Sequence, residues 1–161
     1  MRPSAETLTV IRASAPEHIE QARRLFLEYA HSLGFSLCFQ GFEDELRGLP
    51  GVYSPPSGCL LLAHNSGVAV GCVALRQFNG TICEMKRLYV RPDHRGKGIG
   101  QRLVVGIIAE ARAIGYARMR LDTIASSMQD AIAMYRRVGF REISPYYPNP
   151  MPEALYLELA L

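Results

Sequence analysis

The sequence predicts an α/β (α+β) protein with a mixed, mostly antiparallel sheet, and three observations support this fold class. Apolar segments at 59–64, 68–78 and 81–90 are separated only by short turn sequences, which is typical of an antiparallel meander. A glycine-rich loop, a helical pattern and another strand pattern follow, so the two strands that this helix joins should be parallel. Residues 155–161 alternate apolar and polar side chains and are expected to close the sheet.

The size and charge of the chain narrow the classes of function. It has 161 residues, of which 20% are charged, and a formal net charge of +3. This length predicts a single domain over residues 1–161 with a core of its own. The mild charge argues against nucleic acid as a partner and suits a small anionic ligand. The first residues lack the apolar run of a signal peptide and no segment resembles a membrane span, so we expect a cytoplasmic protein without membrane contact.

The cysteines are widely spaced and fall mostly within apolar segments. They are Cys38, Cys59, Cys72 and Cys83. None forms a C-x-x-C pair, so the spacing supports neither a zinc site nor a redox motif, and no metal is expected. Buried free thiols in a reducing cytoplasm account for them.

The first part of the chain predicts a strand, a helix and an irregular segment. Residues 7–12 alternate like a strand, and Pro16 suits the first turn of a helix that should end at Gly34. In the segment 35–58 a short helix is expected at 42–49, before turns rich in Pro and Gly. The Phe and Tyr residues of this segment either pack onto the core or form a lid over an acceptor substrate.

The third strand of the meander carries an irregularity. Apolar residues occupy odd positions at Cys83 and Met85 but even positions at Leu88 and Val90. This slip of one residue predicts a β-bulge at 86–87, which would leave a backbone N–H unpaired and pointing in a new direction. Alternatively, Tyr89 continues the face formed by the odd-numbered residues, and there is no slip.

The loop after this strand has the sequence RGKGIG at 95–100, directly before a helical pattern. Backbone N–H groups at a helix N-terminus are unpaired and lie at the positive end of the helix dipole, which predicts an anion site, most commonly for phosphate. The glycine spacing fits neither a Rossmann fingerprint nor a Walker loop. The alternative is a basic surface loop whose glycines serve only a turn.

The remaining pattern alternates helices and strands. Helical spacing runs over 99–114 and again after a cap at Ser126 or Ser127. Strand patterns follow these helices at 118–123 and 140–143.

Two sequence motifs and the order of the elements resemble a known family. Residues 83–100, CEMKRLYVRPDHRGKGIG, contain an R-x-x-G-x-G loop after a strand, and residues 135–140 read Y-x-x-x-G-F. Both are similar to motifs of the GNAT family, the GCN5-related N-acetyltransferases, whose order of elements the whole chain resembles. This resemblance implies the GNAT fold, with helices on both faces of the sheet and a splay between strands four and five that holds the pantetheine arm of acetyl-CoA.

The resemblance also implies the chemistry. A neutral amine attacks the thioester carbonyl of acetyl-CoA, and the developing oxyanion needs a preorganised donor, for which the N–H of Leu88 is expected. Tyr135 matches the family's acid, which protonates the leaving thiolate. The residues expected to bind the co-substrate are Leu88, Tyr89, Val90, Arg95, Gly96, Lys97, Gly98, Ile99, Gly100, Gln101 and Tyr135.

The base and the acceptor are less closely defined. Glu84 occupies the position of the catalytic glutamate in histone-type members, but it could equally be an ion-paired carboxylate beside Lys86 and Arg87, with a water chain as the base. Histidines with weaker claims are His31, His64 and His94. The acceptor is expected to be a primary amine of a small molecule or peptide, and Arg76 and Arg87 could pair with a carboxylate on it. A catalytically idle acyl-CoA sensor is the alternative function, and a homodimer is possible.

Overall fold

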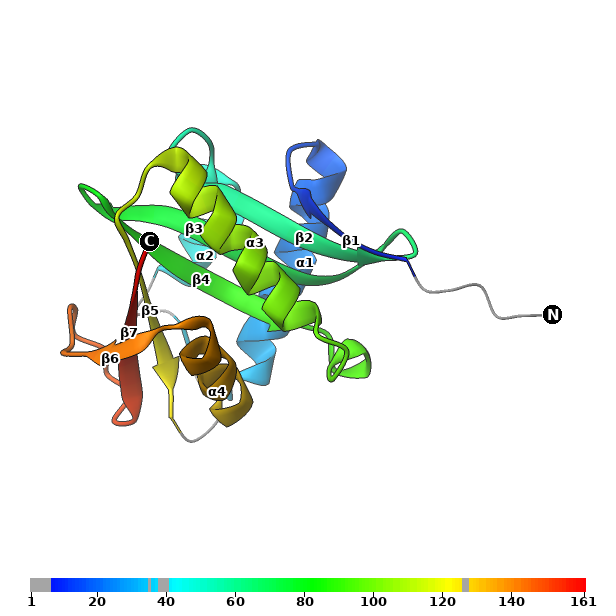
Figure 1. Cartoon of the computed structure of the whole chain (residues 1–161). Coiled ribbons are helices and arrows are strands. Elements are labelled where there is room, and N and C mark those ends of the chain that lie inside the picture. Colours follow the sequence, from blue (N-terminus) through cyan, green and yellow to red (C-terminus); the bar gives the residue numbers. More distant parts are fainter. Residues whose placement is uncertain (1–6, 35, 38–40, 126–127) are drawn as a thin grey trace.

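The computed structural model describes residues 7–34, 36–37, 41–125 and 128–161. It contains seven strands, four α-helices and two short 3-10 helices in these parts of the chain (Figure 1). In order they are β1 (Leu8–Arg12), α1 (Pro16–Ser32), α2 (Phe42–Arg47), η2 (Gly51–Tyr53), β2 (Cys59–Asn65), β3 (Val68–Asn79), β4 (Ile82–Val90), η3 (Pro92–His94), α3 (Ile99–Ile114), β5 (Arg118–Ile124), α4 (Gln129–Val138), β6 (Arg141–Ile143) and β7 (Ala154–Ala160).

The strands form one mixed sheet in the order β1-β2-β3-β4-β5-β7-β6. All neighbouring strands are antiparallel except β4 and β5, which are parallel. The predicted meander and the predicted parallel pair are therefore confirmed, and so is the mostly antiparallel fold class. The predicted element ranges differ from the observed ones mainly at their ends, as for the helix expected at 42–49, which ends at Arg47.

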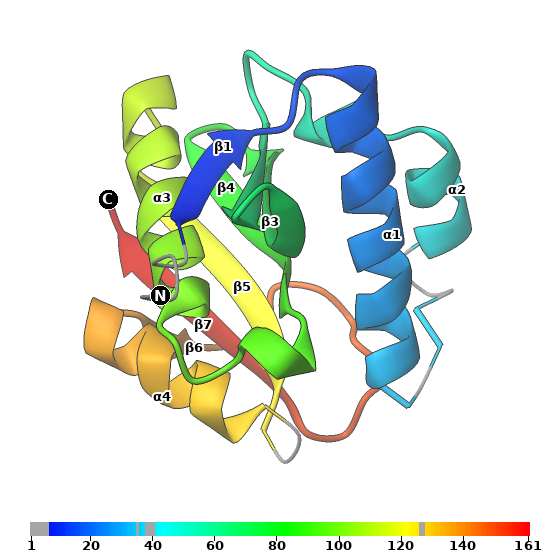
Figure 2. The same ribbon diagram turned by 90° about the vertical axis from the view of Figure 1, so that its right-hand side faces the viewer.

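Helices cover both faces of the sheet, α3 one face and α1 with α2 the other (Figure 2). On the α3 face the helix buries an apolar stripe that includes Leu103 and Ile107, both fully buried. Gly71 of β3 permits this close contact, because a Cβ there would lie 2.9 Å from the Tyr89 carbonyl oxygen and 3.1 Å from Leu103 Cδ1. On the opposite face, Tyr53 of the irregular segment is buried in the core.

The splay expected between the fourth and fifth strands is present. β4 and β5 pair only at Ile82–Glu84 against Arg118–Arg120, and both strands then continue without pairing to each other. Figure 1 shows β5 and β7 running down at a steep angle to β2, β3 and β4. A gap therefore opens along the carboxyl-terminal half of β4.

The bulge in β4 is confirmed by the register. Ala74 opposes Lys86 and Cys72 opposes Tyr89, so two residues of β4 lie opposite one residue of β3. Arg87 has a φ of +61°, which is rare for a residue with a side chain. The slip turns the next apolar side chain, Leu88, onto the α3 face of the sheet.

Other expectations concern caps, cysteines and charge. The N-cap of α4 is Met128, and the proposed caps Ser126 and Ser127 lie outside the described residues. Cys59, Cys72 and Cys83 are buried free thiols, whereas Cys38 lies outside the described residues.

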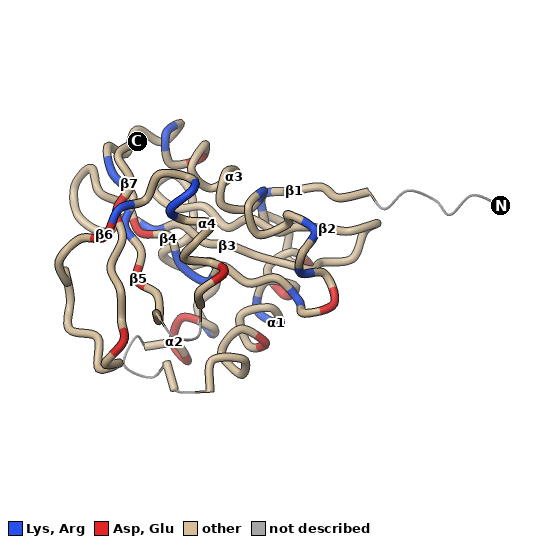
Figure 3. The backbone as a smooth tube through the Cα atoms, turned by 60° about the horizontal axis from the view of Figure 1, so that its bottom comes forward, with Lys and Arg blue, Asp and Glu red and all other residues tan. Residues whose placement is uncertain are grey.

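Basic and acidic positions are interspersed along the backbone (Figure 3). Within the described residues, none of the helices combines the length and apolar character needed to cross a membrane.

Candidate functional site

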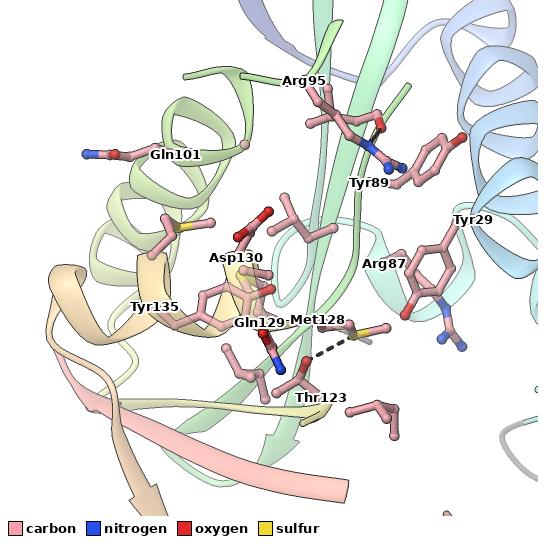
Figure 4. Close-up of a pocket in the computed structure, with 18 of the residues that line it drawn as sticks. Tyr29, Arg87, Tyr89, Arg95, Gln101, Thr123, Met128, Gln129, Asp130 and Tyr135 are labelled. Atoms are coloured by element: carbon pink, nitrogen blue, oxygen red, sulfur yellow. Dashed lines mark hydrogen bonds between the residues drawn. The ribbon is translucent and has the colours of Figure 1, made fainter. Parts of the chain in front are cut away.

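A cleft with a volume of about 910 Å³ lies in the gap between the splayed strands. Its walls come from the second half of β4, the glycine-rich loop, the start of α3, the end of β5, one side of α4 and the end of α1. In Figure 4, Tyr135 on one wall faces Tyr29 and Arg87 on the other. The motifs singled out in the sequence therefore meet in one space.

The glycine-rich loop presents backbone rather than side chains to this cleft. Gly96 and Gly98 both have a φ of +79°, and Gly98 is the N-cap of α3. The first intrahelical bond runs from the Arg102 N–H to the Gly98 carbonyl, at 3.1 Å, so the N–H groups at 99–101 have no acceptor within the helix. The positive end of the helix dipole lies at the same place. These N–H donors and the dipole together suit a phosphate group.

Side chains fix this loop to the strand before it. Arg95 Nε donates to the Val90 carbonyl at 2.9 Å, and its guanidinium carbon lies 5.7 Å from the centroid of the Tyr89 ring. The side chain of Gln101 points away from Arg95 (Figure 4), so its backbone is the part suited to a ligand in the cleft. Lys97 is exposed and does not line the cleft in the described structure, whereas the other residues expected to bind the co-substrate do.

Leu88 lies on the bulge and lines the cleft. In the register of β3 and β4, Leu88 falls within the bulge, between the pairs Ala74–Lys86 and Cys72–Tyr89. A bulge leaves such a residue outside the regular ladder, so its N–H is suited to donate to a developing oxyanion.

Tyr135 reaches the cleft from α4 and its hydroxyl points inward (Figure 4). The ring packs edge to face on Phe140, with centroids 5.7 Å apart, and the residue is 6% exposed. Burial raises the pKa of Tyr135 above its ordinary value, so the phenol stays protonated at neutral pH. It can therefore act as a proton donor in this wall of the cleft.

Glu84 is buried within an ion-paired network. It is 1% exposed, and its Oε1 lies 2.9 Å from Arg76 Nε and 3.6 Å from Lys86 Nζ, while its Oε2 accepts from the Tyr146 hydroxyl at 2.7 Å. Burial alone would raise the pKa of Glu84, but these partners together lower it. Glu84 does not itself line the cleft among the described residues. A role as base stays a prediction, and it would need a relay from the cleft.

Arg87 is also paired, but with a residue that the sequence did not indicate. Its Nε and Nη2 donate to the two carboxylate oxygens of Glu45 at 2.8 and 3.0 Å. The guanidinium also lies over the rings of Tyr29 and Phe42, at 6.0 and 5.2 Å from their centroids. Arg87 therefore lines the cleft with its charge already matched by Glu45. Arg76 is matched in the same way by Glu84 and lines a separate pocket.

The cleft includes two further polar residues that were not named individually from the sequence, although one of them lies in the loop at 146–150, beside which the acceptor was expected. Asp122 of β5 accepts hydrogen bonds from Tyr147 and, at 2.9 Å, from Asn149 Nδ2. Asn149 Oδ1 also accepts from the Met151 N–H at 2.8 Å, which holds the loop between β6 and β7 against the cleft. Polar residues in a strand and a loop carry no spacing signal, and only the fold brings them together.

The histidines named as weaker candidates lie in different places. His94 lines the cleft in η3, where its Nδ1 lies 3.4 Å from Asn65 Nδ2. His64 bonds to Gln21 Oε1 at 2.9 Å, outside the cleft lining, and burial lowers its pKa. His31 is exposed in the last turn of α1. Among the residues that the structure describes, no cluster of His, Cys, Asp and Glu could hold a metal ion.

Comparison with known proteins places this geometry in context. The family model described as "Acetyltransferase (GNAT) family" matches residues 17–140. An uncharacterized N-acetyltransferase of Schizosaccharomyces pombe is 39% identical over 163 residues, which cover 100% of this chain and 98% of that protein.

Two solved structures share the fold. A GNAT-family acetyltransferase of Staphylococcus aureus has a TM-score of 0.78 at 19% identity and covers 96% of this chain and 99% of that one. The PaiA N-acetyltransferase of Thermoplasma acidophilum, solved in complex with coenzyme A, has a TM-score of 0.73 at 16% identity, with 96% and 99% covered.

Proposed function

Because the chain belongs to the GNAT acetyltransferase family and is an acetyl-CoA-dependent N-acetyltransferase, we propose that it acetylates a primary amine of a small molecule or peptide by direct attack on the thioester. The observation that carries the proposal is the meeting of three features in one cleft: the loop at 95–100, the bulge at Leu88 and the hydroxyl of Tyr135. These features correspond to anion binding, oxyanion stabilisation and protonation of a leaving group.

The proposed binding mode assigns the pyrophosphate of acetyl-CoA to the amides at the start of α3. The glycines of the loop allow close approach of a ligand, since a Cβ at Gly96 or Gly98 would meet no atom within 4 Å. The complex of the Thermoplasma protein with coenzyme A supports this choice of co-substrate. The pantetheine arm would then follow β4 through the splay, with Val90 and Leu88 beside it.

The chemistry follows from the groups along this path. The N–H of Leu88 would donate to the oxyanion that forms when the amine attacks. Tyr135 would protonate the sulfur of the departing CoA, a modest help since a thiol has a pKa of about 8.5. The amine must lose a proton, through Glu84 with a relay or through water alone.

The test is turnover of acetyl-CoA with a mixed panel of amino acids, polyamines, aminoglycosides and short peptides, with detection of products by mass spectrometry. We expect saturable binding of acetyl-CoA and an acetylated product from at least one class of amine. Failure to bind acetyl-CoA would refute the proposal. Tight binding without any product would instead favour the alternative of a catalytically idle acyl-CoA sensor.

A further inference from the structure

A second pocket adjoins the main cleft at Lys86. It has a volume of about 320 Å³ and is lined by α2 and the segment after it, together with Arg76 of β3 and Lys86 of β4. Among the described residues, Lys86 is the one that lines both the second pocket and the main cleft. A ligand at this side chain could therefore extend into both spaces.

Lys86 and Arg76 share a single carboxylate. The Lys86 side chain is 9% exposed, and its Nζ lies 3.6 Å from the same Glu84 Oε1 that Arg76 Nε contacts at 2.9 Å. The other oxygen of Glu84 is bound by the hydroxyl of Tyr146. In the described part of the chain, Glu84 is the one carboxylate within ion-pair distance of Lys86, so two cations face one anion.

The other charges around the second pocket do not correct this imbalance. Glu45 lines the pocket, but its two oxygens are bound by Arg87, and one of them also accepts from Tyr53 at 2.9 Å. Asp44 is paired with Arg47 at 2.7 Å. Around the second pocket, Glu84 is therefore shared by two cations, whereas Glu45 and Asp44 are each bound by another arginine.

The environment of Lys86 indicates that its charge is incompletely compensated. Burial lowers the pKa of Lys86, the charges of Glu84 and Asp122 raise it, and those of Arg87 and Arg76 lower it, so that the pKa is lowered overall. A second anion at this place would favour the ammonium form. A charge-assisted bond to a carboxylate would also be strong here, because water is largely excluded.

We propose that Lys86, assisted by Arg76, binds a carboxylate of the acceptor, so that the acceptors are amines that also carry a carboxylate, such as amino acids. This inference rests on the proposed function. Lys86 lies two residues before Leu88 in β4, so a carboxylate bound at Lys86 would keep the amine of the acceptor near the acetyl group proposed to react at Leu88. The second pocket is then available for the side chain of the acceptor.

The test compares each proteinogenic amino acid with its carboxamide as acceptor, in the wild type and in Lys86→Met, Lys86→Arg and Arg112→Met. The carboxamide has a less basic amine, so by reactivity alone it should be the better substrate. We expect the wild type to prefer at least one amino acid by about 10-fold or more in kcat/KM. Lys86→Met should raise KM for that amino acid about 10- to 100-fold at little changed kcat and leave its carboxamide unaffected. Lys86→Arg should recover part of the loss.

Arg112 is exposed in the last turn of α3, so Arg112→Met controls for removal of one charge. Equal turnover of amino acids and carboxamides by the wild type would overturn the inference. An equal loss of kcat/KM on both kinds of acceptor in Lys86→Met would also overturn it, because such a loss indicates a structural role. Acetylation confined to polyamines or aminoglycosides would overturn the inference about the carboxylate and leave the proposed function intact. Absence of acetyl-CoA binding, measured by calorimetry, would overturn the proposed function as well.

Discussion

The two ends of the cleft are built from different parts of the polypeptide. At the end proposed for the co-substrate the donors are backbone N–H groups, placed by glycines at φ +79° and by the start of α3. At the end proposed for the acceptor the groups are side chains, among them Lys86, Arg87 and Asp122, held by ion pairs and hydrogen bonds. The first end suits a ligand that the whole family shares, whereas the second can change one side chain at a time.

This contrast predicts that backbone changes at the first end disrupt co-substrate binding, and that side-chain changes at the second end act on stability or on the acceptor.

Gly98→Val should weaken acetyl-CoA binding by at least about 100-fold, because a β-branched residue disfavours a φ of +79° and would distort the amides at the start of α3. Calorimetric titration with acetyl-CoA measures the effect. Gly115→Val is the matched control, since Gly115 has a φ of +110° at the other end of the same helix. Both variants should lose about 1–2 kcal/mol of stability, but only the first should lose binding. Comparable affinity in the two would refute the loop assignment.

Glu84→Gln should lower the free energy of unfolding at pH 7 by about 3 kcal/mol, because it leaves two cations without their carboxylate. The folded-state pKa of Glu84 is lowered, so its contribution is complete above the unfolded value of 4.5 and is lost as the pH falls through the folded value. Urea unfolding of both proteins at neutral and at acid pH should therefore show a difference that narrows in acid.

Glu158→Gln is the control for Glu84, because Glu158 also bridges two arginines, Arg118 and Arg120, but is no candidate for the base. If Glu84 also takes part in proton removal, only Glu84→Gln should alter the pH dependence of kcat/KM. A normal pH–rate profile in that variant would remove Glu84 from the mechanism.

Tyr135→Phe should lower kcat about 10-fold at unchanged affinity for acetyl-CoA, because it removes the proposed acid and keeps the ring on Phe140. Burial raises the pKa of Tyr135, so ionisation of this phenol should not lower kcat in the wild type up to about pH 10. Tyr116→Phe is the control, since that hydroxyl donates to the Ser57 carbonyl away from the cleft. Equal turnover of Tyr135→Phe and wild type across the pH range would exclude the acid role.

The same contrast explains which features the sequence predicted. The loop at 95–100 and the Y-x-x-x-G-F motif are each a single short stretch of sequence. The bulge in β4 is visible as a slip in the alternation of apolar residues. Each of these signals is local, and the structure brings all three to one cleft. The fold class was predicted for the same reason, since strand alternation, short turns and helical spacing are local properties.

The partners of the buried charges could not be predicted in this way. The sequence suggested that Glu84 is paired beside Lys86 and Arg87, and Lys86 does lie within ion-pair distance of it. The hydrogen bond from Arg76 was not suggested, and it forms because the register of β3 and β4 places Arg76 opposite Glu84. Arg87 instead bonds to Glu45, which is 42 positions away in α2. Such pairings depend on the register and on how a helix packs across the sheet, and neither is written in the neighbouring sequence.

The smallest effect is expected in the loop between β6 and β7. Asn149→Ala removes the bonds to Asp122 and to the Met151 N–H, so the loop should hold the acceptor end less firmly. We expect KM for the acceptor to rise about 3- to 5-fold, the equivalent of roughly one hydrogen bond, with an unchanged Kd for acetyl-CoA. Steady-state kinetics and calorimetry measure the two quantities.

Gln77→Ala is the control for Asn149→Ala, because Gln77 Nε2 donates to the Gly80 carbonyl at 3.1 Å in the hairpin between β3 and β4, away from the cleft. It should change neither KM nor Kd. A parallel loss of acetyl-CoA affinity in Asn149→Ala would show that the two ends of the cleft are coupled through this loop. A change in KM for the acceptor alone would mean that the two ends are independent. Side chains at the acceptor end could then change to suit a new acceptor, while the backbone donors continue to bind the same co-substrate.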